Sequence, residues 1–427
     1  MRLLEFNKKD LFSELKNHLS KRNENSNEKV DEFVKRILDD VKIQGDQALI
    51  KYTKEFDKID LKIDELFLSK EIILSYKDKI NQDVLSSFKK AIKNVKKFHE
   101  LQIPKDYELS EKGVRIRSRW KALDSVGLYV PGGQTVYPSS LIMNIVPAIV
   151  AGIKRIVCVT PPSKFHNPYV LALLDELGIE EVYQVGGAQA IGALTYGTKT
   201  IKAVNKIFGP GNTYVTSAKK QVFGKVGIDL IAGPSEIVVV ANEKNNPNWV
   251  ATDLMAQAEH DINAQSILIT SSKDFADNVL RKIKELNQGL SKKDIIDQSL
   301  ELNGLVILVE DIFKSIEIIN YIAPEHLHLH VEEKEKMIEH ITNAGCIFMG
   351  EYTTEAFGDY ILGTNHILPT SGSAKFSSGL GVLDFMNRNS IVEIDNIGFE
   401  RFQKDVQQMA ETEDLDAHKL SVKIRQN

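Results

Sequence analysis

The middle of the chain repeats one pattern three times: an apolar segment, a glycine-rich turn, and a segment with helical periodicity. The turns lie at residues 131–133, 186–187 and 209–212. Short apolar strands that alternate with helices are typical of α/β folds with parallel sheets. In such a sheet the carboxyl ends of the strands share one edge, where turn amides and helix N-termini can bind phosphate groups. The repeat therefore predicts a parallel α/β fold with a ligand site at that edge.

The three glycine turns favour a nucleotide as that ligand. None of them matches the Gly-x-Gly-x-x-Gly fingerprint, so the pattern alone does not establish an ordinary dinucleotide-binding fold. Any single turn is explained equally well by a tight connection between two elements. Three turns at the ends of successive strands, taken together, indicate a bound nucleotide.

Length and composition limit the classes to which the chain can belong. A chain of 427 residues with 42% hydrophobic and 26% charged residues is typical of a soluble globular protein with two or three domains. The 54 basic and 59 acidic residues give a net charge of -5, which provides no reason to expect a nucleic-acid partner. The longest apolar run, residues 141–151, is interrupted by Asn144 and Pro147, and the N-terminus lacks the apolar segment of a signal peptide. We therefore expect a cytoplasmic protein without a membrane partner.

Two further features indicate structure rather than chemistry. Cys158 and Cys346 are the only cysteines and lie in apolar strand-like segments, which argues against a disulfide framework or a cysteine metal site. Residues 30–41 and 84–98 carry apolar stripes with helical spacing. The sequence therefore predicts a helical N-terminal region that serves as scaffold.

The junction at Glu325 and His326 is the first candidate for chemistry. A helical pattern ends at Ile322, Pro324 disfavours a helical residue before it, and an alternating strand pattern begins at Leu327. An acid beside the side chain that titrates near neutral pH, at the start of a strand, suits proton transfer. A solvated surface loop explains the same pair without any chemistry.

The remaining histidines give weaker signals. Gln257 and His260 are three residues apart on a predicted helix and can face one metal ion, but structural zinc sites usually have more His or Cys ligands. His328 and His330 alternate with leucines, which predicts that they lie on the outer face of a strand. Four others lie in charged or loop segments and are expected to be solvated: His18, His99, His166 and His340.

Eight short motifs, in this order along almost the whole chain, resemble the histidinol dehydrogenase family. They are Tyr129-Val-Pro-Gly-Gly, Gly186-Gly-Ala-Gln-Ala, Gly209-Pro-Gly-Asn, Ala232-Gly-Pro-Ser-Glu, Gln257-Ala-Glu-His, Ala323-Pro-Glu-His-Leu, Gly358-Asp-Tyr and Asp416-Ala-His. The resemblance implies an enzyme that oxidises L-histidinol to L-histidine in two NAD-dependent steps, through an aldehyde that it holds. Such an enzyme completes histidine biosynthesis.

The resemblance also implies roles for individual residues. The catalytic pair is Glu325, which activates water, and His326, which acts as the base. Zinc, which orients the substrate, is bound by Gln257, His260, Asp359 and His418. The substrate contacts Ser235, Gln257, His260, His326, Asp359, Glu413 and His418. NAD contacts Tyr129, Gln189 and Asn212. His366 lies in a similar loop and is not assigned to the ligand set.

The expected organisation follows from the same resemblance. It comprises two incomplete Rossmann-like α/β domains with parallel sheets, a helical N-terminal region and an extended C-terminal tail. An N-terminal arm covers residues 1–25, a discontinuous domain with the metal and catalytic residues covers 26–126 and 236–380, and an NAD-binding domain covers 127–235. Residues 381–427 form a tail with few apolar positions of its own, which needs a partner surface. We expect a homodimer in which each tail completes the site of the other subunit.

Two alternatives from other functional classes use the same residues. A zinc-dependent hydrolase would need the His, Asp and Glu residues but not the three glycine turns. A metal-binding or assembly protein without catalysis would account for the tail.

Overall fold

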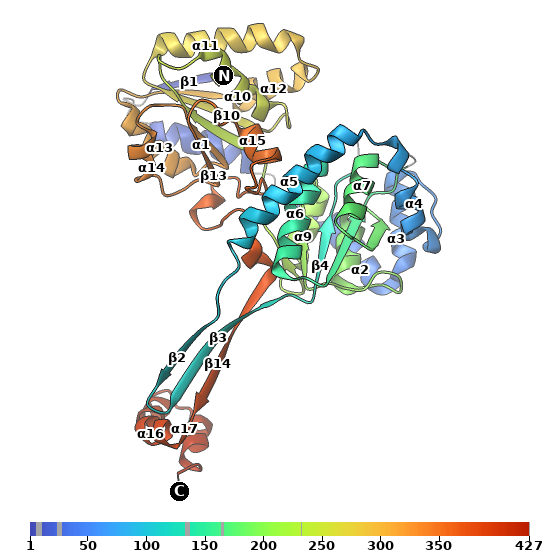
Figure 1. The fold of residues 1–427 in the computed structure, drawn as a ribbon, viewed down its shortest axis with the longest axis vertical. Coiled ribbons are helices and arrows are strands. Elements are labelled where there is room, and N and C mark those ends of the chain that lie inside the picture. The colour runs from blue at the N-terminus through green and yellow to red at the C-terminus, as the bar shows by residue number, and fades with distance from the viewer. Residues whose placement is uncertain (6–10, 24–27, 133–136, 164–165, 232, 427) are drawn as a thin grey trace.

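The computed structural model describes residues 1–5, 11–23, 28–132, 137–163, 166–231 and 233–426. Within them the chain forms two α/β units and a slender element that projects away from both (Figure 1), which confirms the predicted fold class. Gly133 and Ala232, which belong to two of the motifs above, lie outside the described residues. None of the described helices is long and apolar enough to cross a membrane.

The six-stranded unit is a wholly parallel sheet with the order β1-β11-β10-β9-β12-β13. Helices α10, α11 and α12 cover one face through a core that includes Val239 and Leu254, and α1, α13 and α14 cover the other through Leu15 and Ile319. Because both faces are buried, its central strands are nearly continuous apolar runs. The strands are β1 (Arg2–Glu5), β9 (Glu236–Val240), β10 (Gln265–Thr270), β11 (Leu305–Leu308), β12 (His326–Leu329) and β13 (Cys346–Met349). The helices are α1 (Leu11–Asn23), α10 (Pro247–Ala258), α11 (Lys273–Leu286), α12 (Lys293–Asn303), α13 (Ser315–Ile322), α14 (Lys334–Ile338) and α15 (Glu355–Tyr360).

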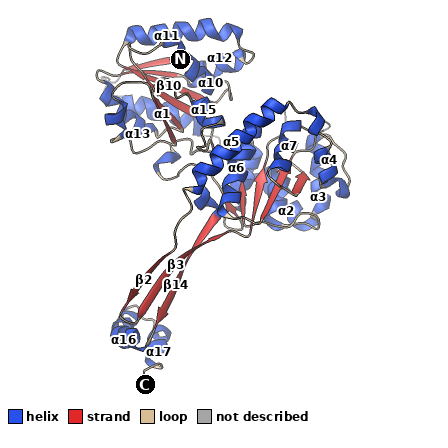
Figure 2. Cartoon of the chain, viewed as in Figure 1, coloured by secondary structure: helices blue, strands red, loops and turns tan. Residues whose placement is uncertain are grey.

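The five-stranded unit is also parallel, with the order β6-β5-β4-β7-β8. One face packs against α5, α6 and α7 and the other against α2, α3, α8 and α9, so that helices flank the sheet on both sides (Figure 2). Its strands are β4 (Ser125–Tyr129), β5 (Arg155–Thr160), β6 (Glu181–Gln184), β7 (Lys206–Phe208) and β8 (Gly227–Ile228). Its helices are α2 (Glu28–Gln44), α3 (Asp46–Tyr52), α4 (Lys70–Leu74), α5 (Gln82–Glu100), α6 (Pro138–Ala151), α7 (Pro168–Glu176), α8 (Gly187–Tyr196) and α9 (Thr213–Val222).

The projecting element, which we call the stalk, is an antiparallel three-stranded sheet that ends in two helices. Its strands have the order β14-β3-β2, and β14 pairs with β3 along nine residues. Apolar side chains remain exposed along it, among them Ile116, Val392 and Met409. The elements are β2 (Tyr107–Glu111), β3 (Val114–Ala122), β14 (Met386–Ile394), α16 (Asn396–Thr412) and α17 (Asp416–Lys423).

The structure differs from the expected domain division in two places. The sequence predicts that residues 26–126 join residues 236–380, but α2 and α5 pack on the five-stranded sheet instead. Their apolar stripes correctly predict buried helices, whereas local periodicity holds no information on which sheet a helix covers. The expected N-terminal arm contains β1, which forms an edge of the six-stranded sheet beside β11.

Candidate functional site

Glu325 is held at the junction that the sequence predicts. Helix α13 ends at Ile322, Ala323 follows in the left-handed conformation with φ 53°, and β12 begins at His326. The backbone N–H of Glu236 donates to Oε2 of Glu325 at 2.9 Å, and the Glu325 side chain is buried. The prediction of a helix-to-strand junction is therefore confirmed, whereas the alternative of a solvated loop is wrong.

The geometry around His326 fixes where its ring carries hydrogen. Nδ1 lies 3.2 Å from the carbonyl oxygen of Glu236 and 3.1 Å from Oε1 of Gln257. Both partners are acceptors, so Nδ1 carries the hydrogen and donates it. Nε2 is buried, has no hydrogen-bond partner among the described residues, and lies 3.8 Å from Oδ1 of Asp359. Burial lowers the pKa of His326 to about 3, so the ring is neutral and presents a free lone pair at Nε2.

A cluster of metal-binding groups faces this lone pair. His260, Glu355 and Asp359 each place one potential ligand atom within 4.8 Å of the others. Burial raises the pKa of Asp359 to about 7, and burial together with the Asp359 carboxylate raises the pKa of Glu355 well above its usual value. Burial also lowers the pKa of His260, which keeps its ring available as a neutral ligand. The buried carboxylate of Glu355 and the half-buried carboxylate of Asp359 need a proton or a cation, and together with the imidazole of His260 they form a donor set that fits zinc.

Gln257 lies beside this cluster, with its side-chain oxygen accepting from His326. It lies on α10, three residues before His260, and its side chain is fully buried. Its Nε2 and the Oε2 of Glu355 have no hydrogen-bond partner among the described residues. Buried polar atoms without a hydrogen-bond partner are rare in folded proteins. They indicate a place where a bound ligand can supply the missing partner.

Glu355 and His366 also lie at this site. Glu355 is not assigned from the sequence, and the loop of His366 is expected near the site without His366 among the ligands. The spacing of four residues between Glu355 and Asp359 puts both carboxylates on one face of α15, and this signal was available in the sequence. His366 contacts the carbonyl oxygen of Asp359 through Nδ1 at 3.0 Å and Oγ of Ser140 through Nε2 at 3.2 Å. Because Ser140 lies on α6, His366 joins the site to the five-stranded unit.

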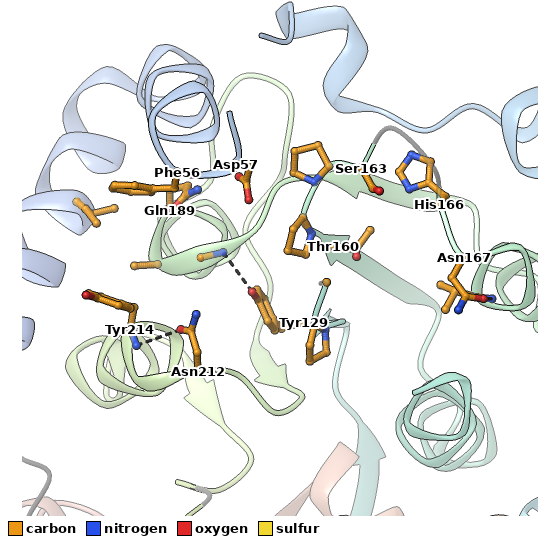
Figure 3. A pocket seen from close by; sticks show the side chains of 18 of the residues that line it. Phe56, Asp57, Tyr129, Thr160, Ser163, His166, Asn167, Gln189, Asn212 and Tyr214 are labelled. Carbon is orange, nitrogen blue, oxygen red and sulfur yellow. Dashed lines mark hydrogen bonds between the residues drawn. The ribbon is translucent and has the colours of Figure 1, made fainter. Parts of the chain in front are cut away.

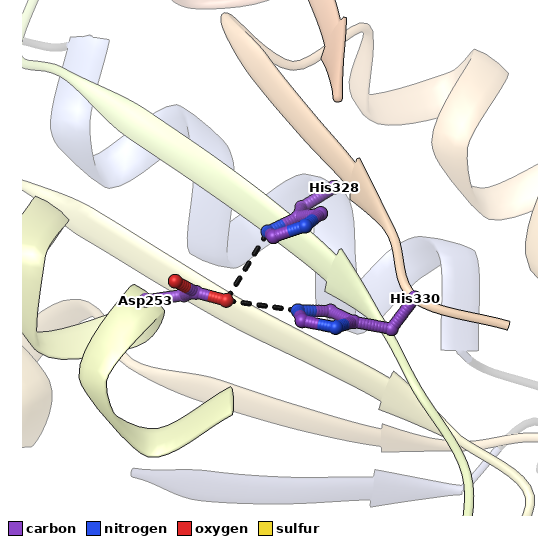
Figure 4. Close-up of side chains that lie close together, drawn as sticks. All are labelled: Asp253, His328 and His330. Carbon is purple, nitrogen blue, oxygen red and sulfur yellow. Dashed lines mark hydrogen bonds and ion pairs between the residues drawn. The ribbon is translucent and has the colours of Figure 1, made fainter. Parts of the chain in front are cut away.

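His328 and His330 lie inside the protein, so the prediction of an outer strand face is wrong for both. Their rings stack at 3.8 Å and are held against Asp253 of α10 (Figure 4). Oδ2 of Asp253 lies 2.8 Å from Nε2 of His330 and 3.2 Å from Nδ1 of His328. Nε2 of His328 donates to the carbonyl oxygen of Gly350 at 3.0 Å. Burial alone would raise the pKa of Asp253, but its contacts with the two histidines outweigh burial and lower it. The three residues join β12 to α10 next to His326.

The remaining residues singled out in the sequence lie farther from His326 and the metal-binding cluster. Ser235 immediately precedes β9, next to the Glu236 peptide that contacts Glu325 and His326. Glu413 and His418 are exposed at the far end of the stalk, so one chain does not bring them to the other predicted ligands (Figure 1). His99, expected to be solvated, lies in the last turn of α5, is fully buried and contacts the carbonyl oxygen of Val95 one turn earlier.

The carboxyl edge of the five-stranded sheet holds a cavity of about 1270 Å³, as predicted from the glycine turns. Tyr129, Gln189 and Asn212 all line it (Figure 3). The N–H of Gly187 donates to the Tyr129 hydroxyl at 3.2 Å, and burial raises the pKa of Tyr129 to about 12. Asn212 caps α9 by accepting from Tyr214 and Val215.

The cavity has room for a large ligand and contains polar side-chain atoms that lack a partner. Gly132 and Gly186 both approach Pro161 closely, and a Cβ on Gly186 would lie 2.5 Å from the Pro161 ring. Larger residues at these turns would therefore push the cavity wall inward. Both polar side-chain atoms of Gln189 are buried without a hydrogen-bond partner among the described residues. A ligand amide or phosphate in the cavity can supply these partners.

Comparison with known proteins gives one consistent result. The profile of the family described as histidinol dehydrogenase matches residues 20–426. The histidinol dehydrogenase of Aquifex aeolicus is 44% identical over 428 residues, with full coverage of both chains, and that of Clostridium acetobutylicum is 46% identical over 410 residues, with 95% coverage of each. The crystal structure of histidinol dehydrogenase from Elizabethkingia anophelis superposes with a TM-score of 0.94 at 36% identity, covering 100% of this chain and 98% of that one.

Proposed function

Because this chain belongs to the histidinol dehydrogenase family of oxidoreductases, we propose that it oxidises L-histidinol to L-histidine by way of L-histidinaldehyde. The reaction removes four electrons and reduces two NAD, and it closes histidine biosynthesis. The observation that carries this proposal is the buried lone pair at Nε2 of His326, which points at a cluster able to hold zinc.

His326 acts as the base in both oxidations. In the first it takes the proton of the substrate hydroxyl at Nε2 while the hydride leaves the same carbon for NAD. In the second it takes a hydroxyl proton of the hydrated aldehyde in the same way. The contacts from Nδ1 to Glu236 and Gln257 hold the ring in the tautomer that this role needs.

Glu325 acts between the two oxidations, when water adds to the aldehyde. Its carboxylate takes a proton from the attacking water, which makes the oxygen a better nucleophile. The backbone N–H of Glu236 orients this carboxylate, and the same residue's carbonyl orients His326. The two peptide groups that flank Glu236 at the start of β9 therefore align both catalytic side chains.

The residues that would hold zinc are Gln257, His260 and Asp359 of one subunit with His418 of the partner subunit. Zinc supplies a template that orients the amino alcohol. Ser235 of the same subunit and Glu413 of the partner subunit complete the substrate contacts. NAD occupies the cavity lined by Tyr129, Gln189 and Asn212.

The position of the tail supports a homodimer with shared sites. His418 is exposed at the end of the stalk, far from His260 of its own chain, and the stalk carries exposed apolar side chains. A closed two-fold pair makes the exchange of tails reciprocal. Co-refolding of inactive His260→Ala and His418→Ala proteins tests this arrangement, because one site of each mixed dimer then has all its ligands. NADH formation should return, and a mixture that contains mixed dimers but stays inactive would refute the exchange.

The activity itself is tested by following NADH absorbance with histidinol and with histidinaldehyde. We expect two NADH for each histidine formed, and loss of activity after complete removal of metal. His326→Asn should impair both oxidations, whereas Glu325→Gln should mainly impair oxidation of the aldehyde. Cleavage of esters or amides without NADH formation would point to a hydrolase instead.

A further inference from the structure

We propose that Asp57 selects NAD over NADP by binding the 2′- and 3′-hydroxyls of the adenosine ribose. This inference rests on the proposed function, because it concerns the cofactor of that same reaction. It assigns a role to a residue outside the three positions expected to contact NAD.

Asp57 is the one acidic side chain among the described residues that line the cavity, whose other described side chains are neutral apart from His166. It ends the short π-helical turn Thr53–Asp57 that follows α3, and its carboxylate extends toward the cavity opposite Tyr129 (Figure 3). Its Oδ2 is shielded from water and has no hydrogen-bond partner among the described residues. Burial raises the pKa of Asp57 to about 6. A ligand that donates hydrogen bonds to this shielded, unpartnered carboxylate therefore stabilises its charged form.

The position of Asp57 in the fold indicates which end of the bound cofactor, adenosine or nicotinamide, lies next to it. The nicotinamide must reach the six-stranded unit, where His326 lies. Helix α3, which leads to Asp57, lies on the side of the five-stranded unit that faces away from the six-stranded unit (Figure 1). A cofactor that extends from one to the other therefore has its adenosine end at Asp57.

Aromatic side chains beside Asp57 suit an adenine. Phe33 lies with its ring centroid 5.9 Å from that of Phe56 and 6.0 Å from that of Tyr214, and all three line the cavity. The rings meet edge to face, at 64° and 74°, so a base can stack on the face of one ring while a neighbouring ring contacts its edge. Asp57 directly follows Phe56, so a base on these rings leaves its ribose near the carboxylate.

The chemistry of the ribose explains the choice between the two cofactors. A vicinal diol offers two O–H donors, and a carboxylate offers two acceptor oxygens. The 2′-phosphate of NADP removes one donor and brings negative charge against the carboxylate. The 2′-phosphate would meet the Asp57 carboxylate, and among the described residues that line the cavity there is no lysine or arginine to offset that repulsion. The cavity therefore accepts the diol and rejects the phosphate.

Binding measurements on the full-length protein test this role without relying on turnover. Dissociation constants for NAD, NADP and 2′-deoxy-NAD are measured by calorimetry for the wild type, for Asp57→Asn, and for the control Asp60→Asn. Asp60 is an exposed acid three residues later that pairs with Lys54 outside the cavity. Far-UV circular dichroism verifies that each variant is folded.

We expect the wild type to bind NAD about 10- to 100-fold more tightly than either analogue, the range for hydrogen bonds to a charged group. Asp57→Asn should lose most of that preference, because its NAD affinity falls while its NADP affinity does not. Asp60→Asn should behave like the wild type. A wild type that binds NAD and 2′-deoxy-NAD equally, or an Asp57→Asn protein that keeps the wild-type preference, would overturn the role of Asp57 alone. A wild type that binds no NAD would instead refute the proposed cofactor.

Discussion

Replacing Asp253 by alanine should destabilise the six-stranded unit strongly. Oδ2 of Asp253 contacts Nε2 of His330 at 2.8 Å and Nδ1 of His328 at 3.2 Å, and all three residues are buried. Alanine removes the hydrogen-bond partner of Nε2 of His330 and the carboxylate that faces Nδ1 of His328. A buried polar group left without a partner costs about 1–3 kcal/mol, so the free energy of unfolding should fall by about that amount.

Asparagine at the same position separates the loss of contact from the loss of charge. Its amide keeps one acceptor and one donor near the two rings, so we expect Asp253→Asn to lose at most about 2 kcal/mol. Asp277→Ala is the control, because this acid on α11 is exposed and pairs with Lys273 on the surface. Its unfolding should match that of the parent protein.

Tryptophan fluorescence during urea unfolding measures these differences. The chain has two tryptophans, Trp249 on α10 beside Asp253 and Trp120 in the stalk. In a Trp120→Phe background the signal reports the six-stranded unit alone. With a urea dependence of about 1–3 kcal/mol per molar, Asp253→Ala should lower the midpoint by at least about 0.3 M. If Asp253→Ala and Asp277→Ala unfold at the same urea concentration, the histidine contacts do not hold β12 to α10.

Three further predictions concern the ligands. Asp359→Asn should reduce zinc content and activity together, with partial recovery in added zinc, and unchanged zinc by elemental analysis would remove Asp359 from the ligands. The pKa of Asp359 is raised to about 7 in the folded protein, so its contribution to stability is present below the unfolded pKa and is lost as pH rises through 7. Metal-free Asp359→Asn should therefore gain stability over the wild type at pH 8 but not at pH 4, as thermal unfolding at both pH values will measure. Tyr129→Phe loses the acceptor for the Gly187 N–H and should weaken NAD binding about fivefold in calorimetry, whereas unchanged affinity would exclude that contact from cofactor binding.

The sequence predicts the helices, strands and turns that follow from local patterns. It does not predict pairings between segments that are far apart in the chain. The strand, turn and helix order of the five-stranded unit follows from apolar runs and glycine turns, and so does the junction at Glu325. Strand β1 is only four residues long with one buried side chain, so its pattern is too short to distinguish from a loop. It becomes a strand because β11 supplies a partner.

The candidate site divides in the same way. Alternation predicts that His328 and His330 share one strand face, but a buried polar face and a solvated one have the same pattern. The difference is Asp253, on a helix far away in the sequence. Gln257 and His260 share a helix and were predicted together, while the approach of Asp359 depends on how α15 meets β12.

The parallel pairing of β1 with β11 sets an order of events during synthesis on the ribosome. Residues 2–5 emerge first, yet their partners at 305–308 are made only after the whole five-stranded sheet, which ends at β8, has left the ribosome. Domains generally fold as units while the chain grows. The five-stranded unit has to wait even longer, because its core includes Leu380, Val382 and Phe385, which are made after residues 305–308. Each unit therefore combines early and late segments of the chain, and neither can complete its core until most of the chain has been synthesised.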